Sequence, residues 1–280
     1  MISALDHIVL LCPDIEVGIV DYSLLMGAEP VWRAQQGGAA TAVFQLQNTA
    51  LELLAPYGEG ETADKLRAMT ADGPKLTTLA YRTDMIDETH RKLGRRGLAP
   101  SEITGGKSTD LNSGAVRTWR RFRLPDERMA GIKSFVLELG GSILEFNNDK
   151  AGVISSLDHI VITTSNPDRA VANYGARLGL RFALDRTAEQ WNTRFLFFRI
   201  GDLTLEIIHT LDSEQALGDL DALMGVTWAV DDLEAAHLRL SEAGRNISEI
   251  RTGRKPGSRV FTVRDGTLGV PTLFIAHAPR

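Results

Sequence analysis

Two histidines and two glutamates lie in strings that the chain repeats. The string L-D-H-I-V around His7 returns unchanged 152 positions later around His159, and the string L-E-L-L with Glu52 returns as L-E-I-I with Glu206. An ionised carboxylate between apolar strand neighbours carries a desolvation cost unless it is paired or bound to a cation. Because imidazole and carboxylate both bind divalent metals, each copy predicts either a metal site or a hydrogen-bonded His–Glu pair.

A second group of reactive side chains lies in the segment R-T-W-R-R-F-R, which begins at Arg117. Side chains of a strand alternate, so Arg117, Trp119, Arg121 and Arg123 are expected to share one face. If that face lines a cavity, it suits an anionic, partly apolar substrate such as a carboxylate or a thiol conjugate. If it faces outward, these are solvated arginines, and the sequence leaves both alternatives open. The string S-R-V-F in the second half keeps an arginine, so Arg259 is predicted as a further substrate-binding residue beside Arg117 and Trp119.

The composition limits the class of protein. A formal charge of -5 and a pI near 5.7 argue against a general nucleic-acid binder. A single cysteine rules out an intrachain disulfide and fits a reducing compartment. No signal peptide is recognisable, and no stretch approaches the roughly 18 apolar residues of a membrane span. We therefore expect a cytoplasmic protein that binds a small molecule and has no nucleic-acid or membrane partner.

The secondary structure is expected to repeat with these strings. In the first unit an apolar run of strand length is followed by Asp14, predicted to cap a helix, and by Gly27, predicted to end it. Three short strands complete a β-α-β-β-β unit. Four such units are expected, at residues 1–56, 74–150, 155–210 and 222–280. They pair into an N-terminal domain at residues 1–150 and a C-terminal domain at residues 155–280. The fold class is therefore α+β, built from four βαβββ modules.

The repeated strings and the four-module layout resemble the vicinal-oxygen-chelate superfamily, also known as the glyoxalase and bleomycin-resistance fold. The strings that carry the resemblance are L-D-H-I-V at two module starts, L-E-L-L and L-E-I-I at two fourth strands, and G-S-I-L-E-F in the expected last strand Ser142–Asn147. The resemblance covers essentially the whole chain. It implies that each domain is a curved mixed sheet that forms a cup with helices outside, and that a metal binds the concave face.

The resemblance also implies one metal ligand from the first and the last strand of each module. These positions are His7, Glu52, Thr78 and Glu145 in the N-terminal domain, and His159, Glu206, Gly225 and Phe274 in the C-terminal domain. Thr78 stands where the family usually supplies another His or Gln, and Gly225 and Phe274 have no ligating side chain. A divalent metal is therefore expected at His7, Glu52 and Glu145, with Thr78 contacting substrate, and the C-terminal cup is expected to be degenerate.

The leading functional hypothesis is a glyoxalase-like, metal-dependent lyase or isomerase that acts on a small oxygen-rich carbonyl compound. The cation would stabilise an enediolate-type intermediate, and Glu145 or Glu52 would be the catalytic base. The alternative is a metal-free binding or sequestration protein of the bleomycin-resistance type, which Thr78, Gly225 and Phe274 favour. An extradiol dioxygenase is rejected because the fourth module lacks the second His and the Glu of the iron site. A homodimer and a monomer both stay open.

The remaining histidines and the cysteine are interpreted as structural. His90 and His237 each follow one apolar residue by four positions and precede another by three, which places them on the sheet-facing side of a helix. His209 and His277 are expected to be structural or exposed, because strand alternation points them away from the cup. Cys12 follows an apolar run and is expected to pack as a small hydrophobic residue.

Overall fold

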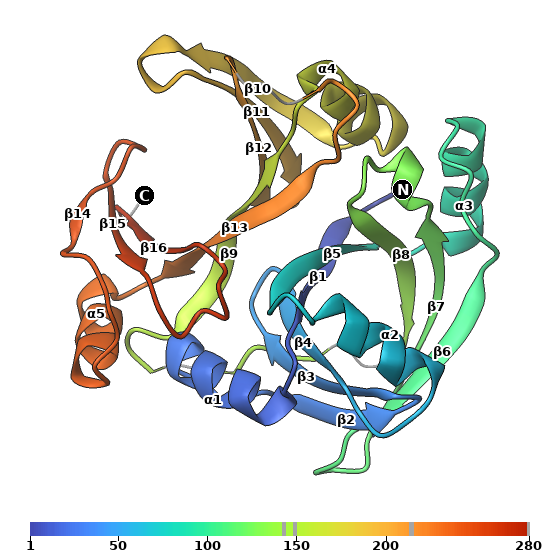
Figure 1. Ribbon diagram of the computed structural model, residues 1–280, viewed down its shortest axis with the longest axis horizontal. Coiled ribbons are helices and arrows are strands. Elements are labelled where there is room, and N and C mark those ends of the chain that lie inside the picture. The colour runs from blue at the N-terminus through green and yellow to red at the C-terminus, as the bar shows by residue number, and fades with distance from the viewer. Residues whose placement is uncertain (142–143, 148–149, 213–215, 279–280) are drawn as a thin grey trace.

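Two eight-stranded mixed sheets form the body of the molecule in the computed structural model (Figure 1). The structure describes residues 1–141, 144–147, 150–212 and 216–278. The strand order is β2-β3-β4-β1-β5-β8-β7-β6 in the N-terminal sheet and β10-β11-β12-β9-β13-β16-β15-β14 in the C-terminal sheet. The two orders correspond strand for strand, which confirms the predicted α+β fold of four repeated modules.

The N-terminal sheet contains β1 (Ala4–Leu11), β2 (Trp32–Gln36), β3 (Ala39–Gln45), β4 (Ala50–Pro56), β5 (Lys75–Arg82), β6 (Thr104–Thr109), β7 (Val116–Leu124) and β8 (Lys133–Gly140). The C-terminal sheet contains β9 (Ile154–Thr163), β10 (Arg181–Ala188), β11 (Thr193–Ile200), β12 (Leu203–Thr210), β13 (Ala222–Val230), β14 (Arg251–Thr252), β15 (Ser258–Val263) and β16 (Thr272–His277). The helices are α1 (Ile15–Met26), α2 (Glu61–Met69), α3 (Ile86–Arg95), α4 (Pro167–Ala170), continued by the π-helical turn η2 (Val171–Arg177), and α5 (Leu233–Glu242).

Helix α1 begins and ends where the sequence predicts. The Asp14 carboxylate accepts hydrogen bonds from the backbone N–H groups of Glu16 and Val17, at 2.8 and 3.1 Å. Gly27 follows the helix with φ 73°, the left-handed conformation that glycine adopts without strain. Among the described helices, none combines the length and the apolar character that a membrane crossing requires.

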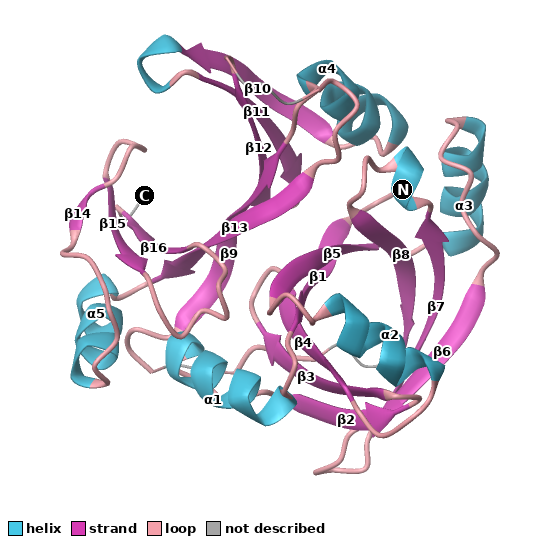
Figure 2. Cartoon of the chain, in the orientation of Figure 1, coloured by secondary structure: helices cyan, strands magenta, loops and turns pink. Residues whose placement is uncertain are grey.

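The helices that belong to the modules pack on the outer faces of the sheets. Figure 2 shows α1, α3 and α5 outside the two curved sheets. Their buried residues, among them Tyr22, Leu93 and Leu240, join strand residues such as Ile8 and Ile160 in one hydrophobic cluster. This cluster contains side chains from both halves of the chain, so the two halves share a continuous core.

Helix α2 differs from the other helices because it lies inside the curve of the N-terminal sheet (Figure 2). Its Leu66 packs with Val9 and Leu11 of β1 in a separate small cluster, with Leu54 and Met69 at its margin. These β1 residues belong to the concave face, so α2 closes one end of the N-terminal cup. The expected units at residues 1–56 and 74–150 leave this segment out, so α2 was not predicted from the sequence.

The last strand of the second module is β8, and the predicted strand Ser142–Asn147 is wrong for its described residues. Strand β8 pairs in parallel with β5, as β16 pairs with β13, and it ends at Gly140. Residues 144–147 follow it without strand structure, while positions 142 and 143 lie outside the described residues. The string F-V-L-E-L, rather than G-S-I-L-E-F, therefore forms the last strand.

The edges of the N-terminal sheet meet, and those of the C-terminal sheet do not. Strand β2 is joined to β6 by Trp32 Nε1 donating to Ser108 Oγ at 2.9 Å, and to the turn after β6 by Arg33 N–H donating to Asp110 Oδ1 at 2.9 Å. The backbone N–H of Leu111 also donates to the Arg33 carbonyl at 2.8 Å. Figure 1 shows β10 and β14, the corresponding edges, far apart. The N-terminal sheet is thus nearly a barrel, and the C-terminal sheet is an open cup.

Arg239 of α5 connects the two halves. Its guanidinium donates to the carbonyls of Leu24 and Leu25 at the end of α1, at 3.2 and 3.0 Å, and to the Gly152 carbonyl at 2.5 Å. The last carbonyls of a helix have no partner within the helix, so a cation there satisfies them and offsets the helix dipole. A Cβ at Gly27 would lie 2.8 Å from the Arg239 guanidinium carbon, so glycine also makes room for this contact.

We predict that Arg239→Ala lowers the free energy of unfolding of the whole chain by about 2–4 kcal/mol, because three partly buried carbonyls lose a charged donor. Chemical denaturation should show a single transition in both proteins, since the halves share one core. Arg251→Ala, which removes an exposed guanidinium from β14, should change the free energy by less than about 0.5 kcal/mol. Two separate transitions in the wild type would contradict the shared core.

Candidate functional site

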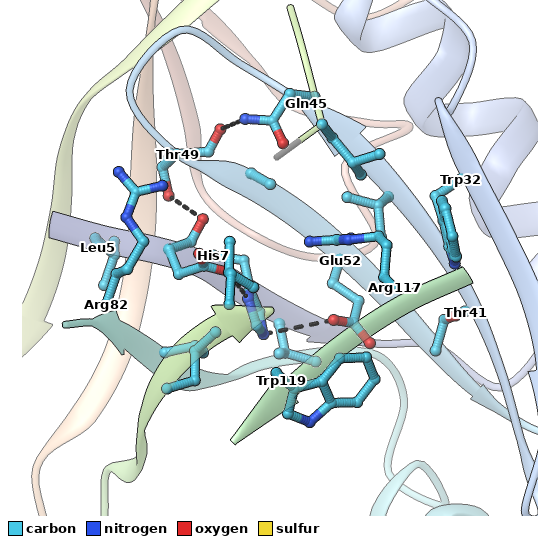
Figure 3. Close-up of a pocket in the computed structure, with 18 of the residues that line it drawn as sticks. Leu5, His7, Trp32, Thr41, Gln45, Thr49, Glu52, Arg82, Arg117 and Trp119 are labelled. Carbon is cyan, nitrogen blue, oxygen red and sulfur yellow. Dashed lines mark hydrogen bonds and ion pairs between the residues drawn. The ribbon is translucent and has the colours of Figure 1, made fainter. Parts of the chain in front are cut away.

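A cavity of about 570 Å³ lies on the concave side of the N-terminal sheet. His7, Glu52 and Thr78 line it, and Figure 3 shows the His7 and Glu52 side chains pointing toward one another. Strands β1 and β4 are parallel neighbours, and their register places Glu52 beside Val9, two residues along from His7. Side chains two residues apart on a strand share a face, so the sheet brings the imidazole and the carboxylate together.

The imidazole of His7 lies between two carboxylates. Its Nδ1 is 2.8 Å from Asp6 Oδ1, and its Nε2 is 3.4 Å from Glu52 Oε2. Consecutive strand residues normally point to opposite faces, but the register of β1 against β5 shifts between Leu5 and His7. Asp6 is the extra residue of this β-bulge, which turns its carboxylate toward the same side as His7.

The surroundings shift the pKa values of His7 and Asp6 in opposite directions. Burial lowers the pKa of His7, but its hydrogen bond to Asp6 and the charge of Glu52 outweigh burial, so the pKa lies above its ordinary value of 6.5. Burial raises the pKa of Asp6, but the hydrogen bond from His7 and the charges of His7, Arg117 and Arg82 outweigh it, so the pKa lies below 3.8. Asp6 is therefore ionised, and His7 keeps its proton to a higher pH than a free imidazole.

Strand β7 turns an arginine-rich face toward the cavity. Arg117, Trp119 and Arg121 line the cavity, so of the two alternatives for this face, the structure shows the inward one. Arg120 lies on the opposite face and pairs with a carboxylate of α3 at 2.8 Å. Arg123, near the end of the strand, pairs with a carboxylate of the following turn at 2.8 Å and does not line the cavity.

Three guanidinium groups in the cavity have no ion-pair partner within the described part of the chain. Arg117 lies 5.5 Å from the ring centroid of Trp32, and Arg121 lies 5.0 Å from that of Phe135. Arg82, at the end of β5, is the third. The Nε atom of Arg117 is buried, and no described residue hydrogen-bonds to it. Because buried polar groups are normally paired, the cavity carries positive charge that is available to an anion.

Glu145 does not reach this cavity. It lies in the segment after β8, its side chain is exposed, and it lines a neighbouring hollow together with Asp231 and Asp232. The residues on either side of it, Leu144 and Phe146, line the cavity instead. The side chains that β8 itself turns to the cavity are aromatic or aliphatic. The structure thus brings His7 and Glu52 together and leaves Glu145 outside.

The described residues do not fit a catalytic metal centre. Such centres usually have three protein ligands and one open position. The cavity offers His7 Nε2 and Glu52 Oε2, and within the described ranges no three His, Cys, Asp or Glu side chains are grouped so as to hold an ion. Asp6 is hydrogen-bonded to Nδ1 of His7. In metal sites, a carboxylate in this position orients the histidine that ligates the metal. Thr78 contributes a neutral hydroxyl, 3.2 Å from that of Thr77.

The C-terminal cup repeats the His–carboxylate arrangement. His159 Nδ1 lies 2.7 Å from Asp158 Oδ1, its Nε2 lies 3.4 Å from Glu206 Oε2, and Asp158 is again the extra residue of a bulge. The Thr227 hydroxyl is 2.9 Å from His159 Nε2. His277 is exposed as expected, but it does not point away from the cup residues, because its Nε2 lies 2.5 Å from Asp158 Oδ2.

Two predicted positions of the C-terminal half face the helices rather than the cup. Phe274 is fully buried in the main core and stacks on a phenylalanine of β15, so its assignment to the concave face is wrong. Arg259 pairs with Glu234 at the start of α5 and therefore lies on the outer face. Gly225 occupies the expected place, because it holds on β13 the register position that Thr78 holds on β5.

His90 and His237 behave as predicted. His90 Nε2 lies 2.8 Å from the Ser101 carbonyl, and His237 Nε2 lies 3.1 Å from the Ser248 carbonyl. Both rings meet a phenylalanine of the neighbouring strand edge-on. Cys12 is fully buried, also as predicted.

The sequence interpretation missed Asp6, Arg82 and Trp32 as cavity residues. Asp6 had a usable signal, because the aspartate before the histidine is repeated in both halves. Arg82 lies four residues after Thr78 on the same strand, so it shares the face already assigned to Thr78. Trp32 had no comparable signal, since its place in the wall depends on the meeting of β2 and β6.

Two family models match the chain. A model of a glyoxalase-like domain matches residues 5–149, and a model of the glyoxalase, bleomycin resistance protein and dioxygenase superfamily matches residues 158–262. A comparison with curated proteins finds no match.

Solved structures of related fold cover nearly the whole chain. A variant of 4-hydroxymandelate synthase from Streptomyces coelicolor superposes with a TM-score of 0.68 at 11% identity, covering 100% of this chain and 94% of that one. A Mn(II)-bound glyoxalase from Novosphingobium aromaticivorans gives 0.64 at 16% identity, with coverages of 99% and 83%. A halotolerant catechol dioxygenase gives 0.62 at 12% identity, with coverages of 99% and 87%. At such low identities these likenesses concern the fold alone.

The glyoxalase-like model spans the four strands and the helix of each of the first two modules, and the superfamily model begins at the repeated L-D-H-I-V string. The first matched region therefore covers the N-terminal sheet, and the second covers the C-terminal sheet from within β9 to within β15, without β16. The chain belongs to the glyoxalase-like family of the vicinal-oxygen-chelate superfamily, with one domain of that superfamily in each half.

Proposed function

We propose that the N-terminal cup binds a small oxygen-rich anion, such as a carboxylate that carries a further carbonyl oxygen, and that it does so without a metal. The observation that carries this proposal is the presence of Arg82, Arg117 and Arg121 in one cavity without an ion-pair partner in the described part of the chain. Guanidinium groups bind carboxylates through two parallel charge-assisted hydrogen bonds. A cavity of about 570 Å³ is large enough for a small molecule of this kind.

His7 and Glu52 complete the proposed site. The raised pKa of His7 favours its protonated form, which adds a cationic donor beside the arginines. Glu52 supplies an acceptor 3.4 Å from His7 Nε2, so hydroxyl or water protons of the ligand would also find a partner. A donor and an acceptor beside a bound carbonyl compound are the groups that proton transfer requires. Binding and proton transfer are therefore compatible at this site.

We predict that Arg117→Gln weakens the binding of pyruvate about 10- to 100-fold, because one charge-assisted hydrogen bond contributes about 1.5–3 kcal/mol. Isothermal titration of the full chain is the measurement. Arg120→Gln is the matched control, since it removes a guanidinium from the outer face of the same strand and should change the affinity less than twofold. Equal losses in the two variants, or no binding by the wild type, would contradict the proposal.

The Asp6–His7 pair predicts a pH dependence of stability. Because the folded-state pKa of His7 lies above 6.5, its contribution is fully present below pH 6.5 and is lost as the pH rises through the folded pKa. The lowered pKa of Asp6 adds stability above pH 3.8, which is lost as the pH falls. Chemical denaturation should therefore show that His7→Gln is more destabilising near pH 6 than at about pH 9. An Asp6→Asn background should reduce this difference, and a greater effect at high pH would refute the assignment.

A metal-dependent lyase or isomerase reaction is the second candidate function. The observation that favours it is the hydrogen bond between His7 Nδ1 and Asp6, because metal-ligating histidines usually make such a bond to a carboxylate. Against it stands the donor set, in which the cavity offers two ligating side chains and Glu145 lies outside. The two candidates differ in whether ligand binding needs a divalent ion.

Metal analysis separates the two candidates. From the donor set we predict well below one ion of Mn, Zn, Fe or Ni per chain after purification without chelator, and an unchanged pyruvate affinity in excess EDTA. His7→Ala should then leave the metal content unchanged. A stoichiometric metal that His7→Ala removes, together with a chelator-sensitive reaction, would establish the lyase or isomerase instead.

A further inference from the structure

In one wall of the N-terminal cavity, the indole of Trp119 lies against a glycine of the neighbouring strand. Trp119 of β7 pairs directly with Gly106 of β6, and a Cβ at position 106 would lie 2.5 Å from Trp119 Nε1 and 2.6 Å from its Cε2. The indole therefore lies directly over the glycine backbone. Any larger residue at this position would displace the indole, because real Cβ atoms do not approach so closely. Gly106 thus leaves the space that the Trp119 indole occupies in the wall.

A second indole is held in place on the same side of the cavity. Trp32 is 5% exposed, and its Nε1 donates to Ser108 Oγ at 2.9 Å. It packs with Val43 and Ala50 in a small apolar cluster, separate from the main core, to which Leu144 adds its side chain. This part of the cavity therefore has an apolar, aromatic surface that exists before any ligand binds.

Arg117 lies at the border between this aromatic wall and the charged groups. Its guanidinium is 5.5 Å from the centroid of Trp32, and its charge interacts with Asp6 and Glu52 without forming an ion pair in the described part of the chain. Figure 3 shows Arg117, Trp32, Trp119 and Glu52 around the same opening. A carboxylate paired with Arg117 would place the remainder of the ligand against the indoles.

We infer that the anion bound by the N-terminal cup is a planar aromatic carboxylate, whose ring contacts Trp119 and Trp32 while its carboxylate pairs with Arg117. This inference rests on the proposed anion-binding function and adds the chemical class of the ligand. Aromatic rings attract one another beyond the area that they bury, and indoles offer large, rigid surfaces for this contact. The positive charge of Arg117 favours a carboxylate, and the indole of Trp119, which lies over Gly106, favours an aromatic ring in the ligand.

The test compares three carboxylates by titration of the full chain: acetate, cyclohexanecarboxylate and benzoate. We expect benzoate to bind about tenfold more tightly than acetate and about threefold more tightly than cyclohexanecarboxylate, which has an apolar ring without a flat aromatic face. Gly106→Ala should displace Trp119 and remove most of the preference for benzoate, while the affinity for acetate changes less than twofold. Arg117→Gln should weaken all three ligands.

The possible outcomes separate the proposal of an aromatic ligand from the proposal of an anion site. Equal binding of benzoate and acetate by the wild type, or a benzoate preference that Gly106→Ala leaves intact, would overturn the aromatic ligand but keep the anion site. Absence of binding for all three would overturn both. Should Gly106→Ala unfold the protein, as thermal unfolding would reveal, Trp119→Leu replaces it with the same expected loss of preference. Gly105→Ala is the matched control, because the nearest described contact of its Cβ is at 4.0 Å.

Discussion

The hydrogen bond between adjacent aspartate and histidine side chains is the contact on which both cups are built. It exists because the first strand of each half contains one residue more than its antiparallel neighbour, so that Asp6 and Asp158 turn to the side of His7 and His159. Although burial raises the pKa of each of these aspartates, the hydrogen bond to the histidine outweighs it and lowers the pKa, and the same bond orients the imidazole toward a glutamate on the parallel strand. A regular strand would place the aspartate under the helices, where an unpaired charge is costly.

The two halves share this arrangement, but they differ in how far each sheet encloses a cavity. The difference arises because the edge strands of the N-terminal sheet meet and those of the C-terminal sheet do not. The meeting of β2 and β6, together with the apolar contact of α2 on β1, converts the N-terminal sheet into a walled cavity. In the C-terminal half, the described contact across the cup is the Arg254 guanidinium 4.1 Å above the Trp191 ring. A charge in a walled cavity is less solvated than in an open cup, so an anion gains more from arginines in the N-terminal half. For this reason the proposed ligand site is the N-terminal cup.

The sequence predicts the features that follow from the internal repeat and from the alternation of side chains along a strand. It does not predict the features that depend on where a strand ends or on a tertiary contact. The repeated strings predict the modules, and the two-residue period predicts that Arg117, Trp119 and Arg121 share a face. Glu145 was assigned to a strand because its string resembles a fourth strand, yet β8 ends earlier, at Gly140. Arg259 was paired with Arg117, but its outward contact with a helix carboxylate makes it the counterpart of Arg120. Side-chain period cannot reveal such a shift, because moving a strand by one residue exchanges its two faces.

The bonds from Arg239 to the carbonyls at the end of α1 mean that the C-terminal half supports a helix of the N-terminal half. The outer surface of the C-terminal half therefore contributes to the stability of the N-terminal half, separately from anything that its hollow side contacts. Substitutions on the hollow side leave these bonds in place. The two hollows already differ in this way, since glycine stands at position 225 where the first half has threonine at the corresponding position 78.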